Sequence, residues 1–342
     1  MKVLWSLAFI FSSIHVYAIN RSAATTMPGI DSLLPVRNSY HQKNEEITSD
    51  LLDAETDYTR TRDNRKALTR FLRILRVKKI DRESRAGYRL FNDLAAVSVR
   101  LKLYPLAMKC YSKAMGPLLD STAYAGLVNA DSSYLTLSPT VYTAKSLPIQ
   151  GPQIWTCFDD GKPASSYAMI VHVKQPVSGR RRSFTHINNV GHMFITLIKY
   201  NDDNSVVSRS FGFYPLKKNI LSGTPLHAGS ASVFKNDTLH DWDEVVGKFI
   251  SFKRFSRIIE VIKYYDHLTY NLNRNNCTDF GLALASIGGI SITETRGTWP
   301  LGKGNNPGNA GQSMLEGKFR NIDADYHDPL FVNNNIQAPA GH

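Results

Sequence analysis

Residues 191–200 read GHMFITLIKY, a run that predicts a β-strand with apolar side chains on both faces. Such a strand is expected at the centre of a sheet, where both faces are covered. The Asp-Asn-rich segment 202–204 favours a turn after it, and 206–214 then predicts the returning strand of a hairpin. Further strands are predicted at 167–173 and 245–252. The sequence therefore predicts an antiparallel sheet in this half of the chain.

Two helices are predicted after the last of these strands. Apolar residues recur at helical spacing between Phe255 and Tyr265, which indicates one amphipathic helix. A second apolar stripe runs from Phe280 to Ile287 on a helix that starts at about Cys277, and the pair Gly288-Gly289 is expected to end that helix. Together with the helical N-terminal part, these patterns predict an α+β fold.

The N-terminal part of the chain carries a helical pattern over residues 46–120. Within it, LFNDLAA (90–96), LYPLA (103–107) and YSKA (111–114) resemble one tetratricopeptide hairpin. A single copy of such a repeat rarely stands alone. We therefore expect this segment to pack on the domain that follows or to form a small helical module, through which it can bind a protein partner.

The first residues predict export. A lysine at position 2 precedes a short apolar run, and residues 16–18 (VYA) offer a cleavage site, so residues 1–18 are interpreted as a signal peptide. A retained N-terminal anchor is the alternative. After cleavage we expect a secreted, periplasmic or cell-surface protein without an integral membrane span.

The remaining boundaries follow from composition. Residues 19–45 are polar and aperiodic and predict a flexible leader. Residues 121–163 are rich in Ser, Thr, Pro and Tyr and predict a loop-rich connection. The sheet domain is placed at 164–315, and an irregular tail at 316–342. Before that tail, the motif NPGNAGQ (306–312) is expected to form a loop.

The chain is strongly basic, with a net charge of +12 over 342 residues. In an exported protein this charge suits anionic surfaces such as cell wall, lipid headgroups or polyanionic polymers. No nucleic-acid-binding motif is recognised, so nucleic acid is not a predicted partner. No metal-binding spacing and no phosphate-binding glycine loop is found, and neither a metal nor a cofactor is predicted.

The chain has three cysteines, Cys110, Cys157 and Cys277. Three are too few for a disulfide scaffold, and the odd number leaves at least one thiol without an intramolecular partner. Cys110 lies on an apolar helical stripe and is interpreted as a buried structural thiol. A Cys110–Cys157 disulfide is conceivable, but the sequence does not decide it.

Cys277 and His192 are the residues that predict chemistry. A cysteine at a helix start is exposed to the favourable end of the helix dipole, which stabilises the thiolate, and nearby N–H groups can hold an oxyanion. His192 begins the central strand, where an imidazole can take the thiol proton and return it to a leaving group. The alternatives are a structural cysteine and a histidine satisfied within the core.

The order of these elements carries a family resemblance. The Gly191-His192 strand, the hairpin ending FGFYP (211–215), the YNL segment (270–272) and NCTDF (276–280) resemble the circularly permuted papain-like hydrolases, which are relatives of NlpC-type peptidases and lecithin:retinol acyltransferase-like proteins. The resemblance covers about residues 165–315. It implies a Cys277 nucleophile and a His192 base.

The resemblance also implies a third, polar residue that orients the imidazole, usually from the strand after the histidine strand. That strand offers Ser208, Ser210 and Tyr214, and Asp241 or Asp243 before the next strand is an alternative. Tyr270 is a further candidate, either for assisting an oxyanion or as a packed core tyrosine. The third residue is left open among these.

The leading hypothesis is an exported cysteine hydrolase of the peptidase or amidase type, with cell-wall peptide as the first candidate substrate. This choice rests on family analogy and basic charge. The alternatives are lipid acyl transfer or deacylation, which a long apolar groove beside Cys277 would favour, and a non-enzymatic binding protein with a degenerate papain-like domain. A blocked Cys277 or a diverted His192 would favour the binding protein.

Overall fold

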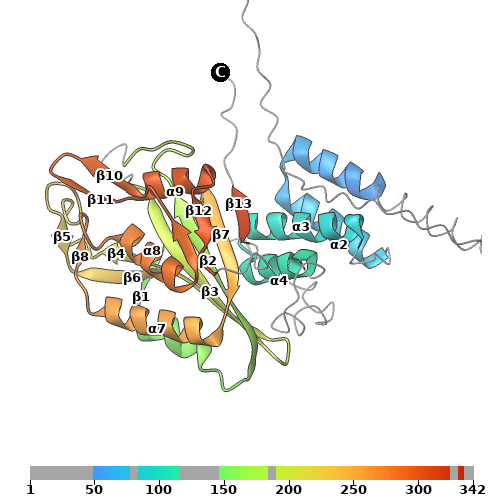
Figure 1. Ribbon diagram of the computed structural model, residues 1–342, viewed down its shortest axis with the longest axis horizontal. Helices are drawn as coiled ribbons and strands as arrows, with labels where there is room; N and C mark the ends of the chain where they lie inside the picture. The colour runs from blue at the N-terminus through green and yellow to red at the C-terminus, as the bar shows by residue number, and fades with distance from the viewer. Residues whose placement is uncertain (1–48, 78–83, 116–145, 184–189, 324–329, 335–342) are drawn as a thin grey trace, which may run out of the picture. The chain divides into compact units, whose positions relative to one another are not determined.

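The computed structural model describes residues 49–77, 84–115, 146–183, 190–323 and 330–334. Helices at the N-terminal side are followed by a large antiparallel sheet and further helices, so the predicted α+β class is confirmed (Figure 1). The predicted signal peptide (1–18), the leader (19–45) and most of the predicted connection lie outside the described residues.

The N-terminal helices form because apolar residues recur along one stripe of each. Residues 49–61 are helical. They are followed by α2 (Asn64–Val77), α3 (Arg85–Arg100) and α4 (Tyr104–Met115). The side chain of Ser84 caps α3 by accepting a hydrogen bond from Gly87 N at 3.1 Å. Helices α3 and α4 pack on each other and α2 packs on α3, so the predicted hairpin is part of a larger helical segment.

Within the described part of the chain, the main sheet has seven strands in the order β1-β6-β4-β3-β2-β7-β13, and every neighbouring pair is antiparallel. The strands are β1 (Leu147–Ile149), β2 (Ala164–Lys174), β3 (His192–Asn201), β4 (Val206–Pro215), β6 (Ser232–Asn236), β7 (Glu244–Ile250) and β13 (Phe331–Asn334). All ten residues of β3 are buried, as its two apolar faces predict. This strand lies at the centre of the sheet and carries His192 at its first position.

The two faces of the sheet are covered by different elements. Phe194, Ile198 and Tyr200 of β3 belong to the same core as the buried residues of α2, α3 and α4. The alternate residues, Met193 and Ile195, belong to a second core. This core includes residues of the helices that lie between β7 and β13 in sequence. Strand periodicity of two residues produces this division.

Among the described residues, three helices lie between β7 and β13 in sequence: α7 (Phe252–Asp266), α8 (Cys277–Ile287) and α9 (Pro307–Leu315). Helix α8 packs on β3 and β4 through the fully buried Phe280 and Leu284, and burial of each such side chain contributes about 1.5–3 kcal/mol. As predicted, α8 starts at Cys277 and is followed by Gly288.

The remaining short elements connect these layers. They are α6 (Pro152–Trp155), the 3₁₀ helix η4 (Thr156–Phe158), β5 (Gly229–Ser230), β8 (Tyr270–Asn271), β9 (Ile290–Ile292), β10 (Arg296–Trp299), β11 (Gly302–Asn305) and β12 (Phe319–Asn321). Among the described residues, no helix is long and apolar enough to cross a membrane.

Three segments are more regular than their composition suggested. The predicted connection contributes β1 to the sheet, and the predicted tail contributes β12 and β13 in its described part. The expected loop at 306–312 lies in helix α9 and its cap: Asn306 caps the helix and Pro307 occupies its first turn, a start signal that the surrounding glycines obscure.

All three cysteines are free in the structure. Cys110 is buried in α4, and burial raises the pKa of its thiol to about 12, which agrees with a structural role. Cys157 is half-buried, and its Sγ lies 3.2 Å from the carbonyl oxygen of Ile154.

Candidate active site

The candidate site lies where two central strands separate. The paired register of β3 and β4 ends at Ile195 and Phe211. Beyond that point β3 stays paired with β2 as far as His192, and β4 stays paired with β6 as far as Pro215. The backbone N–H of Met193 hydrogen-bonds the sulfur of Cys277 in this region. Because β3 and β4 separate here, α8 on one face of the sheet can contact His192, whose side chain lies on the other face with Phe194.

Cys277 is the first residue of α8, and a capping box holds it there. The side chain of Asn276 accepts hydrogen bonds from the backbone N–H of Thr278 at 2.7 Å and of Asp279 at 3.1 Å. Asp279 in turn accepts from the backbone N–H of Asn276 at 3.0 Å. The Asn276 amide also donates to the carbonyl oxygen of Asn305 at 2.8 Å. These bonds fix the helix start against β11.

His192 is held by a buried carboxylate. Its Nε2 lies 3.0 Å from Oδ2 of Asp237, and both side chains are buried. The hydroxyl of Tyr214 donates to the other carboxylate oxygen, Oδ1, at 2.7 Å. Because Nε2 is engaged with Asp237, Nδ1 is the ring nitrogen left to hydrogen-bond Cys277. A hydrogen-bonded chain therefore runs from Cys277 to His192 and on to Asp237. Tyr214 bonds the second oxygen of the Asp237 carboxylate.

Gly212 makes the space for this contact. A Cβ at this position would clash with Nε2 and Cε1 of His192 and with Oδ2 of Asp237. The rings of Tyr214 and Phe194 lie near the imidazole, with centroids 4.1 and 5.8 Å from that of His192. Only a residue without a side chain at 212 is compatible with this packing.

The electrostatics favour a thiolate–imidazolium pair. Burial disfavours charge on His192, but the carboxylate of Asp237 and the hydrogen bonds with Asp237 and Cys277 raise the pKa of the imidazole to about 9. Burial likewise opposes the thiolate, yet the hydrogen bond and charge of His192 hold the pKa of Cys277 below its ordinary value. Asp237 has a lowered pKa because His192 outweighs its burial.

Tyr270 lies at the N-terminus of α8. Its hydroxyl hydrogen-bonds both the backbone and the side chain of Cys277, and burial followed by the nearby sulfur raises the pKa of Tyr270 well above its ordinary value. A neutral hydroxyl beside the nucleophile is a hydrogen-bond donor at the place where an oxyanion would form. Tyr270 is also 4% exposed and packs on Phe213, so both roles expected from the sequence fit its position.

A narrow pocket of about 20 Å³, enough for one water molecule, borders Cys277. Its lining consists of Ser183, Val190, Tyr270, Leu272, Asn276, Cys277, Trp299, Asn305, Asn306 and Pro307. The walls come from β8, the start of α8, the β10–β11 hairpin and the start of α9. Cys277 is 6% exposed and is the member of the proposed pair that lines this pocket.

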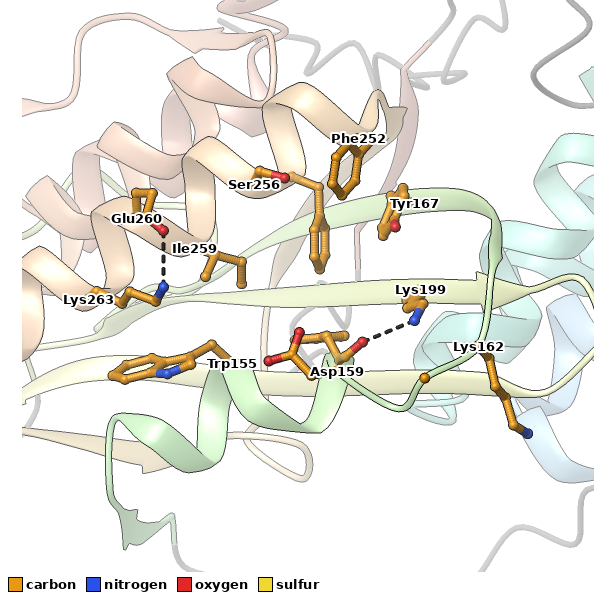
Figure 2. A pocket seen from close by; sticks show the side chains of 13 residues that line it. Trp155, Asp159, Lys162, Tyr167, Lys199, Phe252, Ser256, Ile259, Glu260 and Lys263 are labelled. Carbon is orange, nitrogen blue, oxygen red and sulfur yellow. Dashed lines mark hydrogen bonds and ion pairs between the residues drawn. The ribbon is translucent and has the colours of Figure 1, made fainter.

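A second cleft, of about 540 Å³, lies near the other end of β3 (Figure 2). Trp155, Tyr167 and Phe252 line it, and Lys263 at its edge is paired with Glu260 at 3.0 Å. Lys199, which also lines it, is seven residues from His192, or about 23 Å along a strand. No cysteine or histidine lines this cleft, so its size does not make it the candidate active site.

Of the residues considered for the site, the structure brings together Cys277, His192, Tyr214 and Tyr270. Asp243 lies elsewhere: its carboxylate accepts from Lys174 Nζ, Gln175 N and Ser178 Oγ, all at 2.7 Å. Asp241 pairs with Lys102. Among the described residues, no group of histidine, cysteine and acidic side chains is suited to hold a metal ion.

Sequence reasoning missed Asp237. It directly follows β6, between the predicted strands at 206–214 and 245–252, where no strand was predicted. The pattern SVFKN at 232–236, with Phe234 buried, is the signal that could have revealed this short strand. Its pairing with β4 brings the next residue, Asp237, opposite Ser210 and beside Gly212.

No protein-family model, curated protein or solved structure matches this chain. The assignment of a function therefore depends on the geometry of the site.

Proposed function

We propose that this protein is a thiol hydrolase that cleaves an amide, with Cys277 as nucleophile, His192 as proton carrier and Asp237 as the residue that orients His192. The observation that carries the proposal is the buried hydrogen-bonded chain from Cys277, which lines a pocket, through His192 to Asp237. We further propose that residues 164–315 are a permuted papain-like domain, since the histidine strand precedes the cysteine helix. Export to the cell envelope or beyond is part of the same proposal.

The chemistry follows from the two charges. The Cys277 thiolate attacks the carbonyl carbon, and the carbonyl electrons move to oxygen. When the tetrahedral adduct collapses, the C–N bond breaks and the His192 imidazolium gives its proton to the leaving amine. His192, now neutral, takes a proton from water, whose oxygen attacks the thioester. The C–S bond breaks, and the products are a carboxylic acid and the regenerated pair.

Two features favour catalysis over a purely scaffolding role. His192 hydrogen-bonds Cys277 as well as Asp237, and Cys277 lines a pocket. In the binding-protein alternative, neither feature is required. A basic, exported hydrolase is suited to anionic cell-wall peptide, which remains the first substrate to examine.

The proposal is tested with purified cell-wall peptides and mass spectrometry. We expect new carboxyl and amino termini with the wild type, and none with Cys277→Ser or His192→Ala. Running the reaction in ¹⁸O-water separates the mechanisms, because hydrolysis places one ¹⁸O in the product acid, whereas transfer to another acceptor places none. If an amide panel is turned over equally by the wild type and Cys277→Ser, the proposed nucleophile is wrong.

A further inference from the structure

Asn306 carries a buried amide group with an unused donor. The residue is 4% exposed, and its Nδ2 has no hydrogen-bond acceptor among the described residues. An unpaired buried donor costs about 1–3 kcal/mol. Such a cost is expected to be tolerated where the donor serves a group that binds and leaves, as happens at an active site.

The orientation of this amide is fixed by the helix it caps. Oδ1 of Asn306 accepts the backbone N–H of Asn309 at 2.9 Å, which is the N-cap bond of α9. The backbone N–H of Asn306 is itself bonded to the carbonyl oxygen of Thr295 at 3.0 Å. Flipping the amide would set NH₂ against the N–H of Asn309, so Nδ2 must be the atom that lacks a partner.

Asn306 lies at the Cys277 pocket. Both residues line it. The hydrogen bond from Asn276 to the carbonyl oxygen of Asn305 joins the residues that directly precede them in sequence. Gly297 lets the amide of Asn306 lie close to β10, because a Cβ at position 297 would come within 2.6 Å of Nδ2.

We propose that Nδ2 of Asn306 donates a hydrogen bond to the carbonyl oxygen of the bound acyl group, which becomes the oxyanion when Cys277 attacks. This inference rests on the proposed thiol chemistry. The hydroxyl of Tyr270 hydrogen-bonds Cys277, whereas Nδ2 of Asn306 has no competing acceptor among the described residues, so Asn306 supplies a second donor. The residue would thus bind the acyl oxygen without changing the charge of the nucleophile.

Two probes of Cys277 separate these functions. 2,2′-Dithiodipyridine reports thiolate reactivity and has no carbonyl, whereas p-nitrophenyl acetate requires an oxyanion. Asn306→Ser keeps an N-cap acceptor and removes Nδ2. Asn306→Asp is a second variant that keeps the shape of the side chain and also removes the donor. The quantity compared is the ratio of the ester rate to the disulfide rate, because an altered thiol pKa affects both rates.

We expect both variants to lower this ratio at least about tenfold, since loss of one oxyanion donor costs about 100- to 1,000-fold in other hydrolases. Their melting temperatures should confirm that the fold is retained. An unchanged ratio in a folded variant overturns the role of Asn306, as does a wild type that reacts with the disulfide but not the ester. A wild type whose Cys277 is inert to both probes overturns the proposed function itself.

Discussion

Nε2 of His192 lies 3.0 Å from Oδ2 of Asp237, and the two side chains are 6% and 0% exposed. A buried carboxylate at this distance does two things. It fixes the imidazole so that Nδ1 faces Cys277, and it stabilises positive charge on the ring. In the proposed mechanism, the pair supplies the proton carrier that the Cys277 thiolate needs.

Asp237→Asn should make Cys277 a weaker nucleophile while keeping a side chain of similar size at position 237. The neutral amide cannot hold the imidazolium, so the pKa of His192 falls and that of Cys277 rises. Each unit by which the pKa of Cys277 increases lowers the thiolate fraction about tenfold at a pH below that pKa. We expect alkylation of Cys277 at about pH 6 to slow at least tenfold, and the onset of labelling to move to higher pH.

Asp243→Asn is the matched control for this variant. Asp243 is also a buried carboxylate, but it bonds Lys174, Gln175 and Ser178. This change should reduce the melting temperature and leave the pH profile of Cys277 labelling in place. A profile that shifts with Asp243→Asn and not with Asp237→Asn would reassign the orienting acid.

Gly212→Ala should disrupt the histidine–aspartate contact by steric means. The added methyl group occupies the space where Nε2 and Oδ2 meet, so His192 must rotate or the strands must part. We expect cleavage activity and low-pH labelling of Cys277 to fall by at least about tenfold, as for loss of the acid. Kinetic assays on the purified variant measure both the cleavage rate and the rate of Cys277 labelling.

Gly229→Ala controls for the general cost of replacing a strand glycine. A Cβ at 229 meets only the side-chain nitrogen of Asn271, at 4.0 Å, and has room. This variant should retain wild-type labelling. Equal losses in the two variants would show that the effect of Gly212→Ala is not specific to the site.

The sequence predicted the elements whose signals are local. The apolar run of β3 and the Cys277 helix with its terminal glycine pair all lie where expected. The two short strands β6 and β13 were not predicted, because each has only one buried apolar residue and depends on pairing with a distant strand.

The same reasoning explains the candidate site. Cys277 and His192 were identified from their places at the starts of a helix and a strand. Asp237 was missed because its role depends on the pairing of β6 with β4, and Asp243 was considered because it is close to the next strand in sequence. The need for glycine at 212 is equally invisible in sequence, since it arises from contact between two other residues.

Asp93 in the N-terminal helices should make stability depend on pH. Burial and the negative charge of Glu55 raise the pKa of Asp93 to about 8, above the unfolded value of about 3.9. A carboxyl with a raised folded pKa loses stabilising free energy as pH rises between those two values. Asp93→Asn should therefore increase the free energy of unfolding, relative to wild type, by at least about 1.4 kcal/mol between pH 5 and pH 8.

Asp57→Asn provides the comparison within the same helical segment. Hydrogen bonds with Arg60 and Lys66 lower the pKa of Asp57 to about 2, so it is ionised at both pH values in the folded and the unfolded chain. The difference in the free energy of unfolding between Asp57→Asn and wild type, measured by urea titration, should be the same at pH 5 and pH 8. A pH-independent difference for Asp93→Asn would contradict the raised pKa of Asp93.

The alkylation rate of Cys277 as a function of pH, measured in wild type and in His192→Ala, tests the central claim most directly. The lowered pKa of Cys277 predicts rapid labelling below pH 7 in the wild type, with Cys110 protected by burial. His192→Ala should lose that labelling and react only near the ordinary thiol pKa of about 8.5. Identical profiles in the two proteins, both rising near that value, would contradict an activated cysteine–histidine pair.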